Sequence, residues 1–279
     1  MPSPEMSRTA ASAYVMGHND RERRRLTAQG AIINPLTEQL LRRAGLTSGM
    51  RIVDFGCGVG DISLIAARLV GADGQVTGVD IDGEALSICR QRAREQGFTH
   101  VNFEQANVLE FQPKAPVDAT VGRHILIHTR EPMALFKTAF AALKPGAMAI
   151  FQEYDFSVLH PGYPHTPLRD RLGSTFRDFF GRVTRSDMGT QLYHLALEAG
   201  FCSVDCRVEY PIGGGAESPY YEWFAESLRS ILPRAEALGV ICASDVDIDT
   251  LADRLRQEAV ANGSCIPATM MVGCIARKP

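Results

Sequence analysis

The stretch RIVDFGCGVGD, residues 51–61, decides the fold. A short apolar run ends in Asp54, and glycines follow at alternate positions, Gly56, Gly58 and Gly60. Glycine at a strand-to-helix turn removes side chains, so that a ligand can approach the backbone. The first N–H groups of the following helix also remain free to bind it. The stretch therefore predicts a strand, a ligand-binding turn and a helix, in that order.

The glycine spacing distinguishes between two kinds of ligand. A dinucleotide-binding loop has the pattern GxGxxG, and its third glycine would fall at position 61, where this sequence has Asp61. An acid at the start of a helix repels a pyrophosphate but suits a cationic or amino-bearing ligand. No GK[ST] follows, which excludes a P-loop. The spacing favours an adenosyl ligand without phosphate over a dinucleotide.

A second acid, Asp80, lies twenty residues after Gly60, at the end of the next apolar run, VTGVD. A carboxylate in this place can accept hydrogen bonds from both hydroxyls of a ribose. This contact needs an unphosphorylated ribose, which adenosyl ligands and NAD share.

Short apolar runs alternate with helical patterns as far as Asp155. Strands are predicted at about 51–55, 74–81, 100–107, 117–125 and 147–155, and helices at about 61–71, 83–97 and 130–146. This order indicates a parallel sheet with helices on both faces, whose ligands bind at the carboxyl ends of the strands.

The flanking segments follow other patterns. Residues 1–45 read as a helical N-terminal cap, in which Pro35 suits the first turn of a second helix. Residues 46–279 form the α/β domain, with helical insertions at about 156–186 and 215–263 and a closing strand near the C-terminus.

Five motifs together resemble those of a known family. VDFGCGVGD, VTGVDID, FEQANVLEF, VDATVGRHILIH and LKPGAMAIFQE occur in the order found in class I S-adenosylmethionine (SAM) dependent methyltransferases. The nearest group is the bacterial small-molecule methyltransferases similar to those of ubiquinone and menaquinone biosynthesis. The resemblance implies an α/β fold: a Rossmann-like sheet of seven strands, the last of them antiparallel.

The resemblance also implies a cofactor site for SAM. Asp54, Gly56, Cys57 and Gly58 would line the methionine half of SAM, with Asp61 at the start of the helix that follows. Around the nucleoside and the methionine, the implied contacts are Asp80 at the ribose, Ile81 on the adenine, Asn107 and Val108 in place of the group's usual Asp-Ala pair, Arg123 at the methionine portion, and Tyr14 and Gln29 closing over the cofactor.

Methyl transfer from a sulfonium is a direct displacement, which needs alignment and exclusion of water. A general base is required only if the acceptor must lose a proton. The candidates at strand ends are His124, His128 and Glu153. The aromatic patch PYYEWF would wall an aromatic or isoprenoid acceptor, pack the helices onto the sheet or form a homodimer face.

The composition limits the partners. The net charge of −3 provides no basic field for nucleic acid. Seven cysteines without a CxxC motif argue against a metal site and for a reducing, cytoplasmic setting. The sequence has no signal peptide or apolar span, so we expect no membrane association. The expected activity is SAM-dependent methylation of a small molecule, such as a secondary metabolite. The alternatives are an RNA or protein methyltransferase, an NAD-dependent oxidoreductase and a non-catalytic SAM-binding protein.

Overall fold

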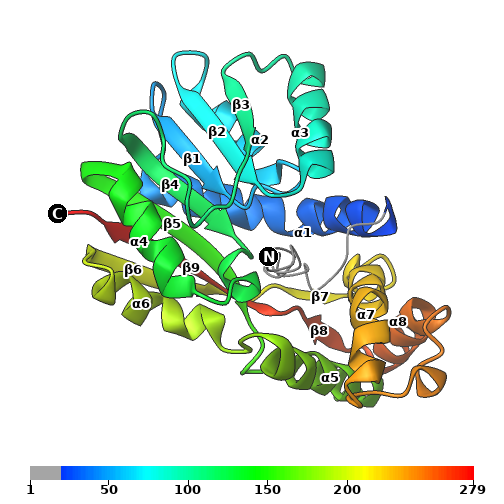
Figure 1. Ribbon diagram of the computed structural model, residues 1–279. Coiled ribbons are helices and arrows are strands. Elements are labelled where there is room, and N and C mark those ends of the chain that lie inside the picture. The colour runs from blue at the N-terminus through cyan, green and yellow to red at the C-terminus, as the bar shows by residue number, and fades with distance from the viewer. Residues whose placement is uncertain (1–19) are drawn as a thin grey trace, which may run out of the picture.

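A seven-stranded sheet forms the centre of the protein (Figure 1). The computed structural model describes residues 20–279. The strand order is β3-β2-β1-β4-β5-β9-β6, and only β9 runs antiparallel to its neighbours. The strands are β1 Arg51–Phe55, β2 Gln75–Asp80, β3 Val101–Gln105, β4 Val117–Arg123, β5 Leu143–Asp155, β6 Cys202–Glu209 and β9 Met270–Arg277. The prediction of a Rossmann-like seven-stranded sheet with an antiparallel last strand is confirmed.

Two helical layers cover the sheet because its central strands are apolar on both faces. Alternate strand residues such as Ile52 and Ile150 pack against helices α1 and α2, whereas Val53 and Phe151 pack against α4 and α6. The helices of these layers are α1 Asp20–Ala44, α2 Asp61–Val70, α3 Gly83–Glu95, α4 Pro132–Ala142 and α6 Met188–Glu198. The alternating pattern of the sequence thus specifies both faces.

Helix α1 is continuous, so the prediction that Pro35 starts a second helix is wrong. Proline removes one backbone hydrogen bond from a helix. The buried side chains on either side of it, Ile33, Leu40 and Leu41, all pack on the core and hold the two halves in one helix. Tertiary packing outweighs the local cost of the proline.

The remaining helices gather beyond the ends of β5 and β9 (Figure 1). They are α5 Pro167–Val183, α7 Tyr220–Ala237 and α8 Leu251–Asn262, with the short helices η1 Leu126–His128 and η2 Ala243–Asp245 and the two-stranded sheet of β7 Ile212–Gly214 and β8 Cys265–Pro267. Their buried side chains belong to the same apolar cluster as one face of the main sheet.

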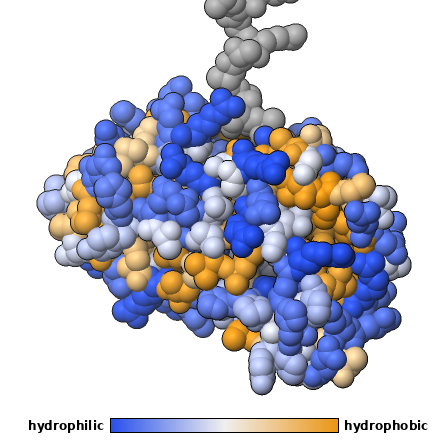
Figure 2. All heavy atoms as spheres, turned by 90° about the horizontal axis from the view of Figure 1, so that it is seen from below, coloured by the Kyte–Doolittle hydropathy of each residue, from blue (hydrophilic) through white to orange (hydrophobic). Residues whose placement is uncertain are grey.

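The lower face of the molecule is mixed in character. Figure 2 shows apolar side chains interspersed with polar ones on the face seen from below. Within residues 20–279, every helix is too short or too polar to cross a lipid bilayer.

Candidate active site

The glycine loop between β1 and α2 is held in a conformation that favours glycine. Gly56, Gly58 and Gly60 have φ values of 69°, 53° and 89°. The backbone N–H groups of Gly56 and Cys57 donate to the carbonyl of Val79, at 2.8 and 3.1 Å, and so tie the loop to the end of β2. A Cβ atom on Gly58 would meet no atom within 4 Å. The loop therefore presents bare backbone to open space at Gly58.

Asp80 is joined directly to this loop. One carboxylate oxygen accepts the N–H of Gly58 at 2.8 Å, and the other accepts the N–H of Asp82 at 2.9 Å. Next to it, Ile81 leaves 60% of its surface exposed, which is unusual for a large apolar side chain. An anionic acceptor and an apolar platform thus lie side by side at the loop, which fits a ribose joined to a flat base.

Asp54 lies behind the loop and is completely buried. Its Oδ2 accepts a hydrogen bond from the Ser63 hydroxyl at 2.6 Å, whereas its Oδ1 has no hydrogen-bond partner among the described residues. Burial raises the pKa of Asp54 to about 7, against the lowering effect of Ser63. An acceptor atom without a donor at this place fits a ligand that brings an amino group or a positive charge.

Cys57 is a buried thiol within the loop. A hydrogen bond with Cys89 is the main cause that raises the pKa of Cys57, and burial is the second. Cys89 in turn donates to the carbonyl of Gly58 at 3.0 Å. Cys57 therefore supports the loop as a neutral thiol, and its contact with a cofactor stays a prediction.

Asp61 forms ion pairs with two arginines. Its Oδ1 lies 2.8 Å from Arg92, and its Oδ2 lies 3.6 Å from Arg123. A Cβ atom on Gly30 of α1 would come within 2.6 Å of this carboxylate. Asp61 thus joins α1 and α3 to the glycine loop, and its direct contact with a cofactor stays a prediction.

The Arg123 side chain points to α1. It donates to Asn34 at 3.0 Å and to Thr37 at 2.7 Å, and burial lowers its pKa while Asp61 raises it. The end of β4 is thereby fastened to α1. A contact of Arg123 with the methionine portion of a cofactor stays a prediction.

His124 follows β4 in a left-handed backbone conformation, with a φ of 55°. Such strain in a residue other than glycine is common at functional sites. Its ring stacks on Tyr154 with ring centroids 3.9 Å apart, and its Nδ1 lies 3.4 Å from Gln29 Nε2. The structure therefore brings together two predicted site residues, Gln29 and His124.

Glu153 lies on the opposite face of β5 from Tyr154 and has no exposed surface. Its carboxylate accepts the backbone N–H groups of Leu126 at 2.8 Å and Ile127 at 3.4 Å. Burial raises its pKa to about 8. Glu153 thus holds η1, whose last residue is His128, and the use of either residue in proton transfer stays a prediction.

Asn107 and Val108 lie just beyond β3. The Asn107 oxygen accepts the N–H of Leu109 at 3.1 Å, and its amide donates to Glu110 at 3.2 Å. Asn107 therefore shapes a turn at the same edge of the sheet as Ile81, with Val108 half-buried behind it. Tyr14, the last of the predicted cofactor residues, lies outside the described residues.

Several residues of the site gave no signal in the sequence. Tyr154, Thr37 and Arg92 join the site through contacts between elements far apart along the chain. The contact of Ser63 with Asp54 is the one that local geometry explains, because the first turn of α2 lies over the end of β1.

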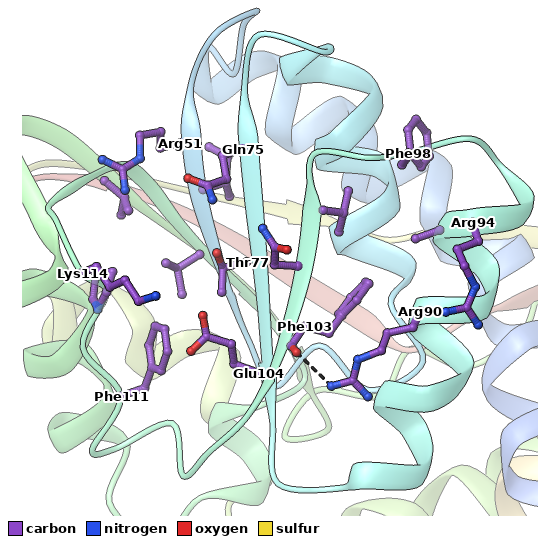
Figure 3. Close-up of a pocket in the computed structure, with 17 residues that line it drawn as sticks. Arg51, Gln75, Thr77, Arg90, Arg94, Phe98, Phe103, Glu104, Phe111 and Lys114 are labelled. Atoms are coloured by element: carbon purple, nitrogen blue, oxygen red, sulfur yellow. Dashed lines mark hydrogen bonds between the residues drawn. The ribbon is translucent and has the colours of Figure 1, made fainter.

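A groove of about 550 Å³ lies elsewhere, along β1–β3 and α3 (Figure 3). Arg51 and Gln75, the first residues of β1 and β2, line it together with Glu104, Phe111 and Lys114. Its location at the amino ends of β1 and β2 separates it from the glycine loop. It takes no part in the arrangement described above.

A family model described as "Methyltransferase domain" matches residues 46–193. The "2-phytyl-1,4-naphtoquinone methyltransferase" of Trichormus variabilis is 31% identical over 192 residues, which cover 64% of this chain and 82% of the relative. The residues matched by the family model include the glycine loop and strands β1 to β5.

Solved structures share the fold at lower identity. The chain resembles a Haemonchus contortus phosphoethanolamine N-methyltransferase solved with S-adenosylhomocysteine, with a TM-score of 0.57 and 20% identity over 88% of this chain and 52% of the other. The chain thus spans about half the length of that protein. A solved structure from Bacillus halodurans shares the fold with a TM-score of 0.57 and 16% identity over 87% of this chain and 98% of the other.

Proposed function

The chain belongs to the class I SAM-dependent methyltransferases, and we propose that it methylates a small aromatic molecule that bears oxygen, of the kind found among natural-product intermediates. The similarity to a naphthoquinone methyltransferase along 82% of that relative supports this acceptor class. All seven cysteines are free thiols within the described residues, which supports our proposal of a cytoplasmic setting.

The unit of Gly58 and Asp80 carries the proposal. SAM, when bound, supplies a methyl group on a positively charged sulfur. Asp80 would hold the ribose hydroxyls, and Ile81 would pack on the adenine. The unpartnered Oδ1 of Asp54 and the bare backbone at Gly56 and Gly58 would hold the methionine half.

His124 is the base that we propose for an acceptor that must lose a proton. The chain segment that carries His124 passes the glycine loop, because a Cβ atom on Gly56 would come within 2.6 Å of the side chain of Ile125, the next residue. Proton transfer to Nε2 requires the other ring proton on Nδ1. The side-chain oxygen of Gln29 can hold that proton once its amide is turned.

Calorimetric titration with S-adenosylhomocysteine tests the cofactor site. Asp80→Asn should weaken binding about tenfold to a hundredfold, because a charged acceptor for two hydroxyls is lost. Asp118→Asn is the matched control, since Asp118 is an acid at the amino end of β4, where it pairs with Lys144 at 2.6 Å. Equal affinity of Asp80→Asn and the wild type, or binding of NAD instead, would refute the assignment.

A further inference from the structure

The only tryptophan of the chain has an unused hydrogen-bond donor. Trp223 lies on α7 with 8% of its surface exposed, and its indole Nε1 is buried without a hydrogen-bond partner among the described residues. A buried donor without a partner costs free energy that an apolar side chain of similar shape would avoid. Packing alone therefore does not account for a tryptophan at this position.

Tyr221, two residues earlier on the same helix, shows the usual arrangement of a buried donor that has a partner. Tyr221 is fully buried on the same helix, and its hydroxyl donates to the carbonyl of Gly215 at 3.0 Å. Phe224, which contacts Phe176 at 5.1 Å between ring centroids, packs the same helix without any polar atom. Trp223 is the exception on this part of α7.

Two ring contacts connect Trp223 to His124, which precedes a residue that packs against the glycine loop. The Trp223 ring lies 6.3 Å from that of Tyr154, with the planes inclined by 42°. Tyr154 stacks on His124 at 3.9 Å, and His124 precedes Ile125, which packs against Gly56. The unused donor therefore lies two ring contacts from His124, the residue that precedes the contact with Gly56.

We propose that the Trp223 indole N–H recognises an oxygen atom of the methyl acceptor. The inference rests on the proposed function and adds to it a residue that determines specificity. A neutral, buried donor between aromatic rings suits the carbonyl or hydroxyl oxygen of an aromatic ring, which brings no full charge into the apolar cluster. An analogue without the oxygen would leave the donor unpaired and would be rejected.

Nuclear magnetic resonance observes this donor directly, because a single tryptophan gives a single indole N–H signal. The ¹⁵N-labelled full chain, saturated with S-adenosylhomocysteine, is titrated with 1-naphthol and with 1-methylnaphthalene, which replaces the hydroxyl by a methyl group. We expect 1-naphthol to bind and to shift the indole proton downfield, and 1-methylnaphthalene to leave the proton shift near its starting value.

Two variants separate recognition from packing. Trp223→Phe should abolish the preference for 1-naphthol, which we expect to be about three- to tenfold in the wild type, while S-adenosylhomocysteine binding persists. Tyr221→Phe, which removes a satisfied hydroxyl, should lower the melting temperature and keep the preference.

The outcomes distinguish this inference from the proposed function. If S-adenosylhomocysteine binds but 1-naphthol does not bind, or binds without moving the indole signal, the role of Trp223 is refuted. Retention of the preference in Trp223→Phe refutes it as well. If S-adenosylhomocysteine itself does not bind the wild type, the proposed function fails first, and the role of Trp223 falls with it.

Discussion

Two buried carboxyl groups, Asp54 and Glu153, keep their protons at pH values at which exposed acids are ionised. Burial is the main cause in both cases, and it raises the pKa of Asp54 to about 7 and that of Glu153 to about 8. The hydrogen bonds that each group accepts, from Ser63 and from the N–H groups of η1, offset part of this effect. Burial therefore favours the neutral, protonated form of each side chain over the ionised form.

The free energy of unfolding should fall as the pH rises from about 4 to about 8. Between the unfolded and folded pKa values of these acids, the folded protein binds more protons than the unfolded chain, so each unit of pH lowers the free energy of unfolding by up to about 1.4 kcal/mol per group. Glu153→Gln should flatten the upper part of this slope. Urea unfolding at about pH 5 and about pH 8 measures the slope for each variant.

Glu104→Gln is the control for this measurement, because Glu104 is an exposed acid on β3. Its slope should match that of the wild type. An unchanged slope in Glu153→Gln would mean that Glu153 is ionised in the folded protein.

The sequence predicts the site residues at the strand ends but not the side chains that pair with them. The glycines, Asp80 and His124 lie where a parallel sheet places ligand contacts, so their positions follow from the order of the strands. The pairing of Asp61 with Arg92 and Arg123 depends on how α1 and α3 pack, which no local pattern specifies.

Polar contacts join helix α1 to the carboxyl end of the sheet, in addition to its apolar packing. Arg123 donates to Asn34 and Thr37, and Thr37 also donates to Gln152 at 2.6 Å. Asp61 provides the charge that balances Arg123 below the helix. The α1 helix is therefore held over the proposed site by a small ionic cluster.

Asp61→Asn should destabilise the protein by about 3–5 kcal/mol, because Arg123 would remain buried without its ion-pair partner. Glu38→Gln, which breaks the exposed pair with Arg42, should cost about 0–1 kcal/mol. Chemical denaturation of both variants gives the comparison. Similar small losses in the two variants would mean that the buried cluster does not hold α1.

The elements between residues 51 and 155 were predicted in type and order because their strands are apolar and their helices amphipathic. The error at Pro35 has a physical cause, since burial of apolar side chains on both sides of the proline holds one helix together. The contacts of the insertions could not be predicted, because aromatic residues in PYYEWF fit a core, a pocket and an interface equally well.

The whole molecule is joined by an aromatic cluster between the sheet and the insertions. Phe156, just after β5, stacks on Phe180 of α5 at 4.3 Å, and Phe176 of the same helix contacts Phe224 of α7. These residues belong to the apolar cluster that also includes one face of the main sheet. The insertions and the sheet therefore share one core.

A shared core predicts a single cooperative unfolding transition. Fluorescence of Trp223, which lies in the insertion, and circular dichroism of the whole chain should give coincident denaturation curves. Phe180→Ala should lower the free energy of unfolding by about 3–5 kcal/mol and move both curves together. An earlier transition in the fluorescence curve would show that the insertions unfold separately.

The most direct test of the proposed reaction is a count of transferred methyl groups. The protein is incubated with methyl-labelled SAM and a 2-alkyl-1,4-naphthoquinol, which represents the proposed acceptor class. We predict that the label appears in the aromatic product in equal amount to S-adenosylhomocysteine, and that Asp80→Asn slows both. If SAM binds but neither product forms, methyl transfer to this acceptor class is contradicted.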